Sequence, residues 1–227
     1  MKNSIVVFLI CLALSSCSEK PQSASSVLTD QETAPKTKVE EHDNQEMVKG
    51  IIDPFFDLGN EEMIKMSFGE KVLKYQMDTQ NAEVSYPAIM VFPETDRELI
   101  FGFASDDSTL DKYEHLEYIS TKAERWLTED GIFVGMTLAQ LEELNGAPFS
   151  FFGLEHDMAG YCWFENGKLK EKSPRLGIRL EPASNQTHQE TFQTLYTDDI
   201  LKSDNPAAQK AGFRVVYIRI LNPKASF

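Results

Sequence analysis

A short apolar run near the start of the chain separates a leader from the part that can fold. Met1, Lys2 and Asn3 precede ten successive apolar residues, Ile5–Leu14. A cationic start followed by a short apolar run is the layout of a secretory signal peptide, and this run is too short for a stable transmembrane span. We therefore expect residues 1–16 to be a signal peptide and leave them out of the fold.

The next segment, residues 17–49, has no hydrophobic periodicity. Ser, Gln, Glu, Thr, Pro and Lys dominate it, as in Ser23–Ser26 and Glu40–Asp43. Such a composition cannot bury enough apolar surface to offset the entropy lost on ordering, so it predicts a disordered tether. Some 30 residues of flexible coil span about 30 Å, which would hold a domain clear of membrane headgroups. The globular region is then expected at residues 50–227.

The composition suits a folded domain and excludes two classes of partner. Hydrophobic residues make up 41% of the chain and include 15 Phe, so a sizeable core is possible. The formal net charge of −14 would repel nucleic acid and anionic lipid headgroups. We expect no nucleic-acid partner. An acidic surface could attract cations or basic partners, but solubility alone explains it.

The first half of the globular region predicts one short helix followed by several strands. Asn60–Phe68 has helical spacing and Gly69 as its stop signal. Short apolar runs separated by turn-like residues predict strands over Val72–Met77, Ala88–Phe92, Leu99–Phe103 and Leu116–Ile119. Strands in such close succession indicate an antiparallel meander rather than alternating strands and helices.

The second half is read from its glycines and caps. Gly131–Gly135 is predicted as a short strand, and Thr137 with Gln140 predicts a capping box for a helix that ends at Asn145-Gly146. Asn166-Gly167 predicts a hairpin with a type I′ turn. Strands are also expected over Phe149–Phe152 and over Leu176–Leu180, the latter with Arg179 outward. Glu181–Glu190 is expected to be a loop, and Thr191–Lys210 is ambiguous, with helix near Pro206–Lys210. The last expected element is an alternating strand over Phe213–Leu221, with Val215, Tyr217 and Arg219 on one face.

These elements predict an α+β fold built from antiparallel β-sheet meanders with few short helices. The region could also be divided into two halves, 50–128 and 129–227, because each half has a short helix and several strands. A tandem duplication is conceivable, although the residues of the two halves barely match.

We assign no catalytic, cofactor-binding or metal-binding residue from the sequence. Cys162 is the mature chain's one cysteine besides Cys17, and it is read as a small buried hydrophobe because no base or cation is near it in sequence. His156-Asp157, Asp198-Asp199 and the group Asp106, Asp107 and Asp111 lack the spacing of a metal site, so they are read as polar loops and solvated turns.

Tyr161 and Trp163 mark the one aromatic stretch that suggests an interaction surface. They alternate with Cys162 and Phe164, so on a strand the two pairs occupy opposite faces. A strand that is apolar on both faces is either covered on both sides or presents one face to a partner. Core packing and a partner-binding surface both stay open at this point.

Leu14-Ser15-Ser16-Cys17 resembles the lipobox of bacterial lipoprotein signals. The resemblance implies cleavage before Cys17 and a membrane anchor of diacylglyceryl and N-acyl groups on that residue. Ser18, where an aspartate would retain lipoproteins in the enterobacterial inner membrane, implies sorting to the outer membrane. The alternative is an ordinary signal peptide with a chance cysteine.

A second resemblance covers about a fifth of the chain. Residues 126–138, with the pattern W-x-T-x-x-G-I-x-V-G, followed by Asn145-Gly146-Ala147-Pro148-Phe149, resemble a family of uncharacterised bacterial envelope proteins. The likeness continues through Phe152-Gly153, Asp157, Gly160 and Gly167-Lys168-Leu169. A weaker likeness, over Gly135–Pro148, is to small outer-membrane lipoproteins of the SmpA/OmlA type, which would imply a protein-interaction role in envelope assembly.

The sequence therefore favours a lipid-anchored envelope domain that binds a protein or another envelope component without catalysis. An envelope hydrolase with dispersed active-site residues and a purely structural lipoprotein are the alternatives. A deep pocket with converging polar groups would favour the hydrolase. An exposed aromatic patch around Tyr161 and Trp163 would favour the binding domain.

Overall fold

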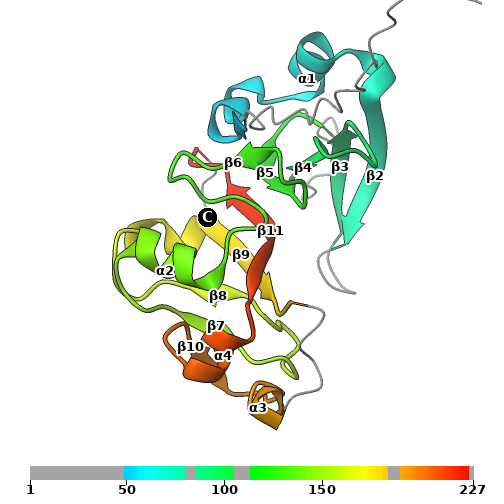
Figure 1. Cartoon of the computed structure of the whole chain (residues 1–227). Coiled ribbons are helices and arrows are strands. Elements are labelled where there is room, and N and C mark those ends of the chain that lie inside the picture. The colour runs from blue at the N-terminus through cyan, green and yellow to red at the C-terminus, as the bar shows by residue number, and fades with distance from the viewer. Residues whose placement is uncertain (1–48, 80–84, 105–112, 184–189, 225–227) are drawn as a thin grey trace, which may run out of the picture. The chain divides into compact units, whose positions relative to one another are not determined.

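The computed structural model describes residues 49–79, 85–104, 113–183 and 190–224 (Figure 1). The predicted signal peptide, Cys17 and almost all of the tether lie outside these ranges. So do Asp106, Asp107, Asp111 and most of the predicted loop Glu181–Glu190. Within the described ranges, the structure contains no helix long and apolar enough to cross a membrane.

The largest element is a six-stranded antiparallel sheet with the order β2-β3-β4-β5-β11-β9. Its first four strands are neighbours in sequence as well as in space, and β11 is inserted between β5 and β9 (Figure 1). The strands are β2 (Leu73–Thr79), β3 (Ser85–Val91), β4 (Leu99–Phe103), β5 (Leu116–Thr121), β9 (Leu176–Glu181) and β11 (Arg214–Leu221).

Two smaller sheets accompany it. One is antiparallel, with the order β10 (Ile200–Lys202), β7 (Ser150–Phe152) and β8 (Cys162–Trp163). The other is a parallel pair of β1 (Gly50–Ile51) and β6 (Trp126–Leu127), which the sequence did not predict. The indole ring of Trp126 lies over Gly50, where a side chain would collide with it.

The helices are short, and with the antiparallel sheets they confirm the α+β class. The α-helices are α1 (Glu61–Phe68), α2 (Leu138–Asn145), α3 (Glu190–Gln193) and α4 (Pro206–Lys210); the 3-10 helices are η1 (Asp53–Leu58), η2 (Glu70–Val72) and η3 (Lys170–Arg175). The helical interpretation of Pro206–Lys210 is confirmed, whereas the ambiguous segment before it also contributes β10.

Both predicted helix boundaries are confirmed by their caps. The Asn60 side chain accepts a hydrogen bond from the Met63 N–H at 3.1 Å, and α1 ends at Gly69. At the start of α2, Thr137 and Gln140 form the reciprocal capping box. These caps depend on neighbours in sequence, which explains why they were predictable.

The prediction of a strand at Gly131–Gly135 was wrong. Both glycines have positive φ, 85° and 95°, so the segment turns at each end. The Gly131 N–H donates to the Thr128 carbonyl at 2.8 Å, which closes the first turn. Strand pairing is reduced to a single bridge between Phe133 and Leu127.

The predicted hairpin at Asn166-Gly167 was also wrong, because a residue far away in sequence forms hydrogen bonds with the backbone of this segment. Asn145 is fully buried, and its Nδ2 donates to the carbonyls of Ala147 and Asn166 at 2.7 and 3.0 Å. Its Oδ1 accepts the Leu169 N–H at 3.0 Å. The chain therefore passes from β8 into η3 instead of turning straight back.

A bulge in β11, the last strand of the chain, breaks the alternation that the sequence predicted for it. The pairing with β9 shifts register between Val215 and Tyr217. Val215 consequently packs in the core with Ile218, whereas Tyr217 and Arg219 lie on the opposite face. The prediction that Val215 shares a face with those two residues was therefore wrong.

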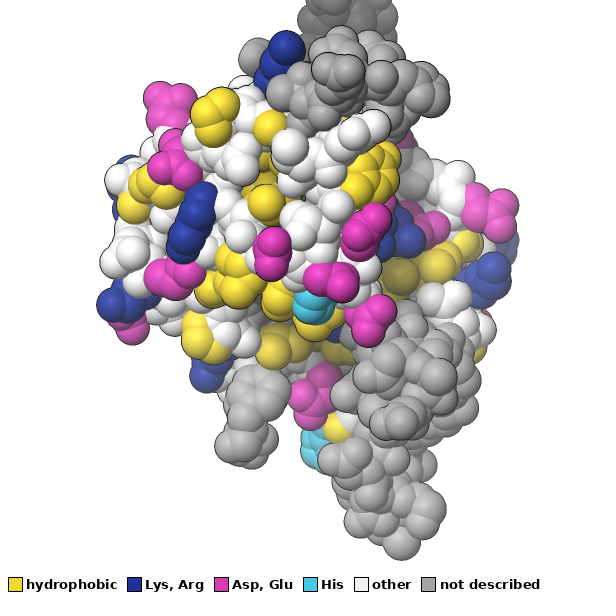
Figure 2. Space-filling model, turned by 90° about the horizontal axis from the view of Figure 1, so that it is seen from below, with side chains coloured by type: hydrophobic (Ala, Val, Ile, Leu, Met, Phe, Trp, Pro, Cys, Tyr) yellow, Lys and Arg dark blue, Asp and Glu magenta, His cyan; other side chains and the backbone are white. Residues whose placement is uncertain are grey.

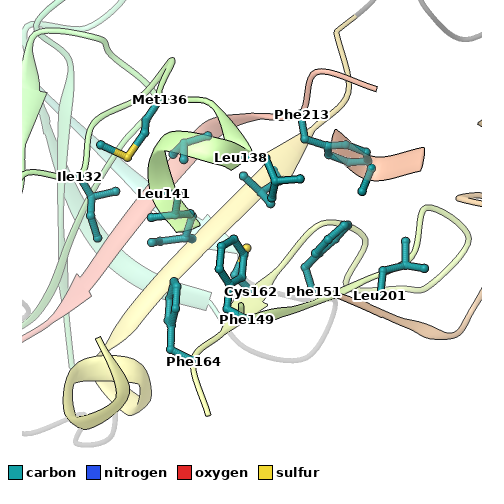
Figure 3. Close-up of a cluster of buried hydrophobic side chains, with 14 of the residues drawn as sticks. Ile132, Met136, Leu138, Leu141, Phe149, Phe151, Cys162, Phe164, Leu201 and Phe213 are labelled. Carbon is teal, nitrogen blue, oxygen red and sulfur yellow. The ribbon is translucent and has the colours of Figure 1, made fainter. Parts of the chain in front are cut away.

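The buried side chains form two clusters. The first cluster draws on η1, α1 and the sheet from β3 to β5, and includes Ile52, Phe56, Ile64, Ile89, Phe101, Phe103, Ile119 and Trp126. The second cluster lies around α2 and the small antiparallel sheet (Figure 3), and includes Ile132, Leu138, Leu141, Phe149, Phe151, Cys162, Ile178, Phe213 and Ile218. Ile220 of β11 packs against both clusters.

Replacing Asn145 by Ala should lower the free energy of unfolding by roughly 2 to 4 kcal/mol, because three polar groups lose their partner. Thr137→Ala, which removes one half-exposed cap, should cost about 1 kcal/mol. Urea unfolding followed by circular dichroism measures both. Equal losses for the two variants would show that Asn145 does not hold the turn.

Candidate functional site

The outward surface of the small antiparallel sheet carries a group of touching aromatic rings. Phe152 stacks on His156 with ring centres 3.9 Å apart, and its ring lies 4.8 Å from that of Trp163. Ile200, the register partner of Phe152 on β10, is 56% exposed. Phe151, Cys162 and Leu201 occupy the buried side of the same three strands.

Acidic side chains surround this group. The loop that follows β7 runs beside the segment before β10, since the Gly153 N–H donates to the Asp199 carbonyl and the Leu154 N–H to the Leu195 carbonyl. We call the result the acidic aromatic face: Phe152, His156, Trp163 and Ile200, with the exposed residues Glu155, Asp157, Asp198 and Asp199 around them. Figure 2, which views the end where β7, β10 and α3 lie in Figure 1, shows hydrophobic side chains among acidic ones.

Tyr161 belongs to a different group, on the large sheet. It forms a bridge with Arg179 of β9, and its ring approaches Tyr217 of β11 at 6.3 Å. The guanidinium of Arg219 then lies 5.5 Å from the Tyr217 ring and 4.6 Å from the Tyr118 ring. We call this set, Tyr118, Tyr161, Arg179, Tyr217 and Arg219, the arginine–tyrosine face.

The two residues that the sequence singled out therefore lie in two separate groups. Tyr161 and Trp163 are both partly exposed, while Cys162 and Phe164 are buried. The two pairs therefore differ in burial, which agrees with the opposite faces that the alternation predicts. His156 was read as part of a polar loop, but it packs flat on Phe152. The arginine–tyrosine face was missed because its members come from three strands, β5, β9 and β11, and from the residue before β8, and the sequence does not reveal how these pair.

A pocket of about 500 Å³ lies between η1, the 128–130 loop, η3 and the end of β11. The half-buried side chain of Asp53 lines this pocket, and its Oδ2 accepts a hydrogen bond from the Glu129 N–H at 2.8 Å. Desolvation raises the pKa of Asp53 above its ordinary value, and the nearby carboxylates of Glu129 and Asp130 act in the same direction. Lys172 pairs with Asp130 at 2.7 Å and leaves Asp53 without an ion pair among the described residues.

One serine lies in a charged cluster, but its hydroxyl is buried. Ser150 donates to Glu165 at 2.7 Å and accepts from Lys202 Nζ at 2.6 Å. Desolvation opposes ionisation of Glu165, yet hydrogen bonds from Ser150 and Lys202 outweigh it and hold the pKa of Glu165 below its ordinary value. With Ser150 fully buried and Lys202 paired to a carboxylate, the cluster presents no open nucleophile.

The other candidates from the sequence are structural where they can be described. Burial raises the pKa of the Cys162 thiol well above its ordinary value, which opposes formation of the reactive thiolate. Asp198 and Asp199 are exposed, and Asp199 bonds locally to Thr197. Within the described ranges, His, Cys, Asp and Glu side chains do not gather in threes around a possible metal position.

Comparisons with known proteins identify no family for the chain. No family model matches it, and no curated protein matches it significantly. Among solved structures, it is similar to the uncharacterized protein yfeY from Escherichia coli, with a TM-score of 0.41 and 10% identity over 77% of this chain and 97% of that chain. Neither fold nor function is inferred from so distant a likeness.

Replacing Asp53 by Asn should raise the free energy of unfolding at pH 7. Because the folded protein holds the pKa of Asp53 above its unfolded value, the carboxylate costs stability as pH rises through that folded pKa. The asparagine can still accept the Glu129 N–H. The gain should shrink as the pH falls towards 3.8, the ordinary pKa of the group.

Urea unfolding at several pH values measures this gain. Asp204→Asn, at an exposed position with the same charge change, serves as the control and should show little effect at any pH. A loss of stability for Asp53→Asn that is the same at pH 7 and pH 4 would contradict the role given to burial.

Proposed function

We propose that this chain is a lipid-anchored, non-catalytic binding domain of the bacterial envelope, and that its acidic aromatic face receives a basic polypeptide partner. The observation that carries the proposal is the combination of exposed apolar side chains with a surrounding set of carboxylates on that face. The lipobox resemblance at Cys17 supplies the proposed anchor, through diacylglyceryl and N-acyl groups. Ser18 favours the outer membrane as its destination.

The composition of the face supports a protein partner. Aromatic side chains and methionine are enriched at protein interfaces. Ile200, the register partner of Phe152, is 56% exposed. Met158 and Tyr196, in the segments that follow β7 and precede β10, are 48% and 43% exposed. Covering them would bury apolar surface worth about 25 cal/mol per Å².

The charge of the face supports a basic partner. Glu155, Asp157, Asp198 and Asp199 are all exposed, and Lys202, the nearby cation, is paired with Glu165. In a chain of net charge −14, such a surface attracts lysine and arginine side chains and repels anionic membranes. A tether of about 30 residues would allow the face to reach a partner away from the anchoring membrane.

The pocket lined by Asp53, Asp130 and Lys172 is a feature that the hydrolase alternative predicts, but the two nucleophile candidates give that alternative no support. Ser150 is fully buried in its ion-pair cluster, and the Cys162 thiol is buried on the core side of β8. An acyl-transfer site needs an open nucleophile beside a base and an oxyanion hole. The purely structural alternative leaves the exposed apolar surface of the acidic aromatic face unexplained.

Ile200→Lys should weaken binding of a basic partner about tenfold or more, because it places a cation at the centre of the face. Met66→Lys makes the same change at an 81% exposed position on α1 and should leave binding unchanged. The measurement uses the full chain in envelopes, photo-cross-linked from the acidic aromatic face. Each protein captured is then purified and its affinity measured at two salt concentrations.

A basic protein that binds the wild type and the Met66 variant, loses affinity for the Ile200 variant and binds less tightly at high salt is the expected result. Equal affinity for both variants, or an acidic partner, would contradict the proposed face. Cys17→Ser separates the two parts of the proposal: it should release the chain from membranes and incorporate no labelled fatty acid, while the purified chain keeps its affinity.

A further inference from the structure

The pocket beside η1 has the size of a small-molecule binding site. It encloses about 500 Å³, which lies within the usual range for such sites. Its lining comes from η1, the 128–130 loop, η3 and the end of β11, so four separate parts of the chain meet around it. We call it the Asp53 pocket, after the half-buried carboxylate that lines it.

The apolar lining of the Asp53 pocket comes from both hydrophobic clusters. Phe56 belongs to the first cluster and Leu176 to the second, and both side chains are buried. Ile220, which packs against both clusters, and Leu221 line the same pocket and are partly exposed. A ligand that covers these side chains would gain free energy from the burial of apolar surface.

Both cations that line the pocket are already engaged. Lys172 Nζ donates to the two carboxylate oxygens of Asp130, each at 2.7 Å, and this pair joins η3 to the 128–130 loop. Arg175 Nη1 donates to the Pro223 carbonyl at 3.0 Å. Four carboxylates and these two cations line the pocket, so its lining has a net negative charge at neutral pH.

Asp53 is a half-buried carboxylate of the pocket with no ion pair among the described residues. Its Oδ2 accepts one hydrogen bond, from the Glu129 N–H at 2.8 Å. The hydrogen bond with Asp130 is the main cause that raises the pKa of Lys172, and the charge of Asp53 is a minor one, so the Lys172 ammonium chiefly serves Asp130. A carboxylate that is partly removed from water without a counter-ion favours a ligand that supplies a positive charge.

We propose that the Asp53 pocket binds a small organic ammonium ion, whose charged group meets the Asp53 carboxylate while its apolar body covers Leu176 and Leu221. An inorganic cation would leave the apolar lining uncovered, and an anionic ligand would face a lining of the same charge. This site is separate from the acidic aromatic face and does not depend on the proposed partner or anchor.

Benzylamine, as its ammonium ion at neutral pH, is the probe, and the purified full chain is titrated with it by calorimetry and by NMR. We expect saturable binding. Benzyl alcohol keeps the ring without the charge, and methylamine keeps the charge without the ring; each should bind about tenfold more weakly or worse. Benzoate, with the opposite charge, should show no saturable binding. These comparisons use the wild type and need no variant to fold.

Asp53→Asn should weaken benzylamine binding about tenfold or more, because it removes the charge and keeps the size of the side chain. The control is Asp57→Asn, which makes the same charge change on η1. Asp57 is exposed and pairs with Lys224 at 3.1 Å, and neither residue lines the Asp53 pocket. An unchanged or raised free energy of unfolding for the Asp53 variant would show that its loss of binding is not due to unfolding.

The amide resonances locate the bound ammonium ion. Benzylamine should shift the resonances of Thr128 and Leu221, which line the pocket, more than those of Ile200 and Trp163 on the acidic aromatic face. The proposal is overturned if benzylamine does not saturate, if benzyl alcohol or methylamine binds as tightly, or if the two aspartate variants bind benzylamine alike. Shifts confined to the acidic aromatic face would overturn it as well.

Discussion

The backbone pairing of β11 is the interaction on which the rest of the structure depends. This strand bonds to β5 on one side and to β9 on the other, and so joins the meander of the first cluster to the strand that supports the second. Ile218 lies fully buried in the second cluster, and Ile220 packs against both. Without β11, each cluster would lose side chains that pack against it, and β9 would lose its neighbour in the large sheet.

The bulge in β11 also determines which of its side chains lie on each face of the large sheet. The register shift after Val215 lets that residue and Ile218 both face the core. Tyr217 and Arg219 are thereby directed to the opposite face, where they meet Arg179 and Ser120. One local irregularity thus serves the core and places Arg219 beside the rings of Tyr118 and Tyr217.

What could be predicted from the sequence was local. The caps at Asn60 and Thr137 use neighbours three residues away. Strand alternation places Cys162 and Phe164 on the face opposite Tyr161 and Trp163. The turn at Asn166 could not be predicted, because buried Asn145 competes for it from 21 residues away. That distant hydrogen bonding outweighs the intrinsic preference of the Asn-Gly pair.

The same division applies to the candidate sites. Trp163 was singled out from the sequence without deciding between core packing and a partner surface. Its contact with Phe152, which is itself stacked on His156, could be found only from how β8 pairs with β7. The arginine–tyrosine face depends on register across β5, β11 and β9 and on a bridge to Tyr161. No single stretch of sequence contains a sign of it.

Native-state hydrogen exchange tests most directly the claim that β11 couples the two clusters. The slowest amides of β4, in the first cluster, and of α2, in the second, should open with the same free energy. Ile218→Ala should lower both by about 2 to 5 kcal/mol, the usual cost of such a cavity. If α2 opens at a clearly lower free energy than β4, or if the substitution destabilises only the second cluster, the two clusters are independent and the account is contradicted.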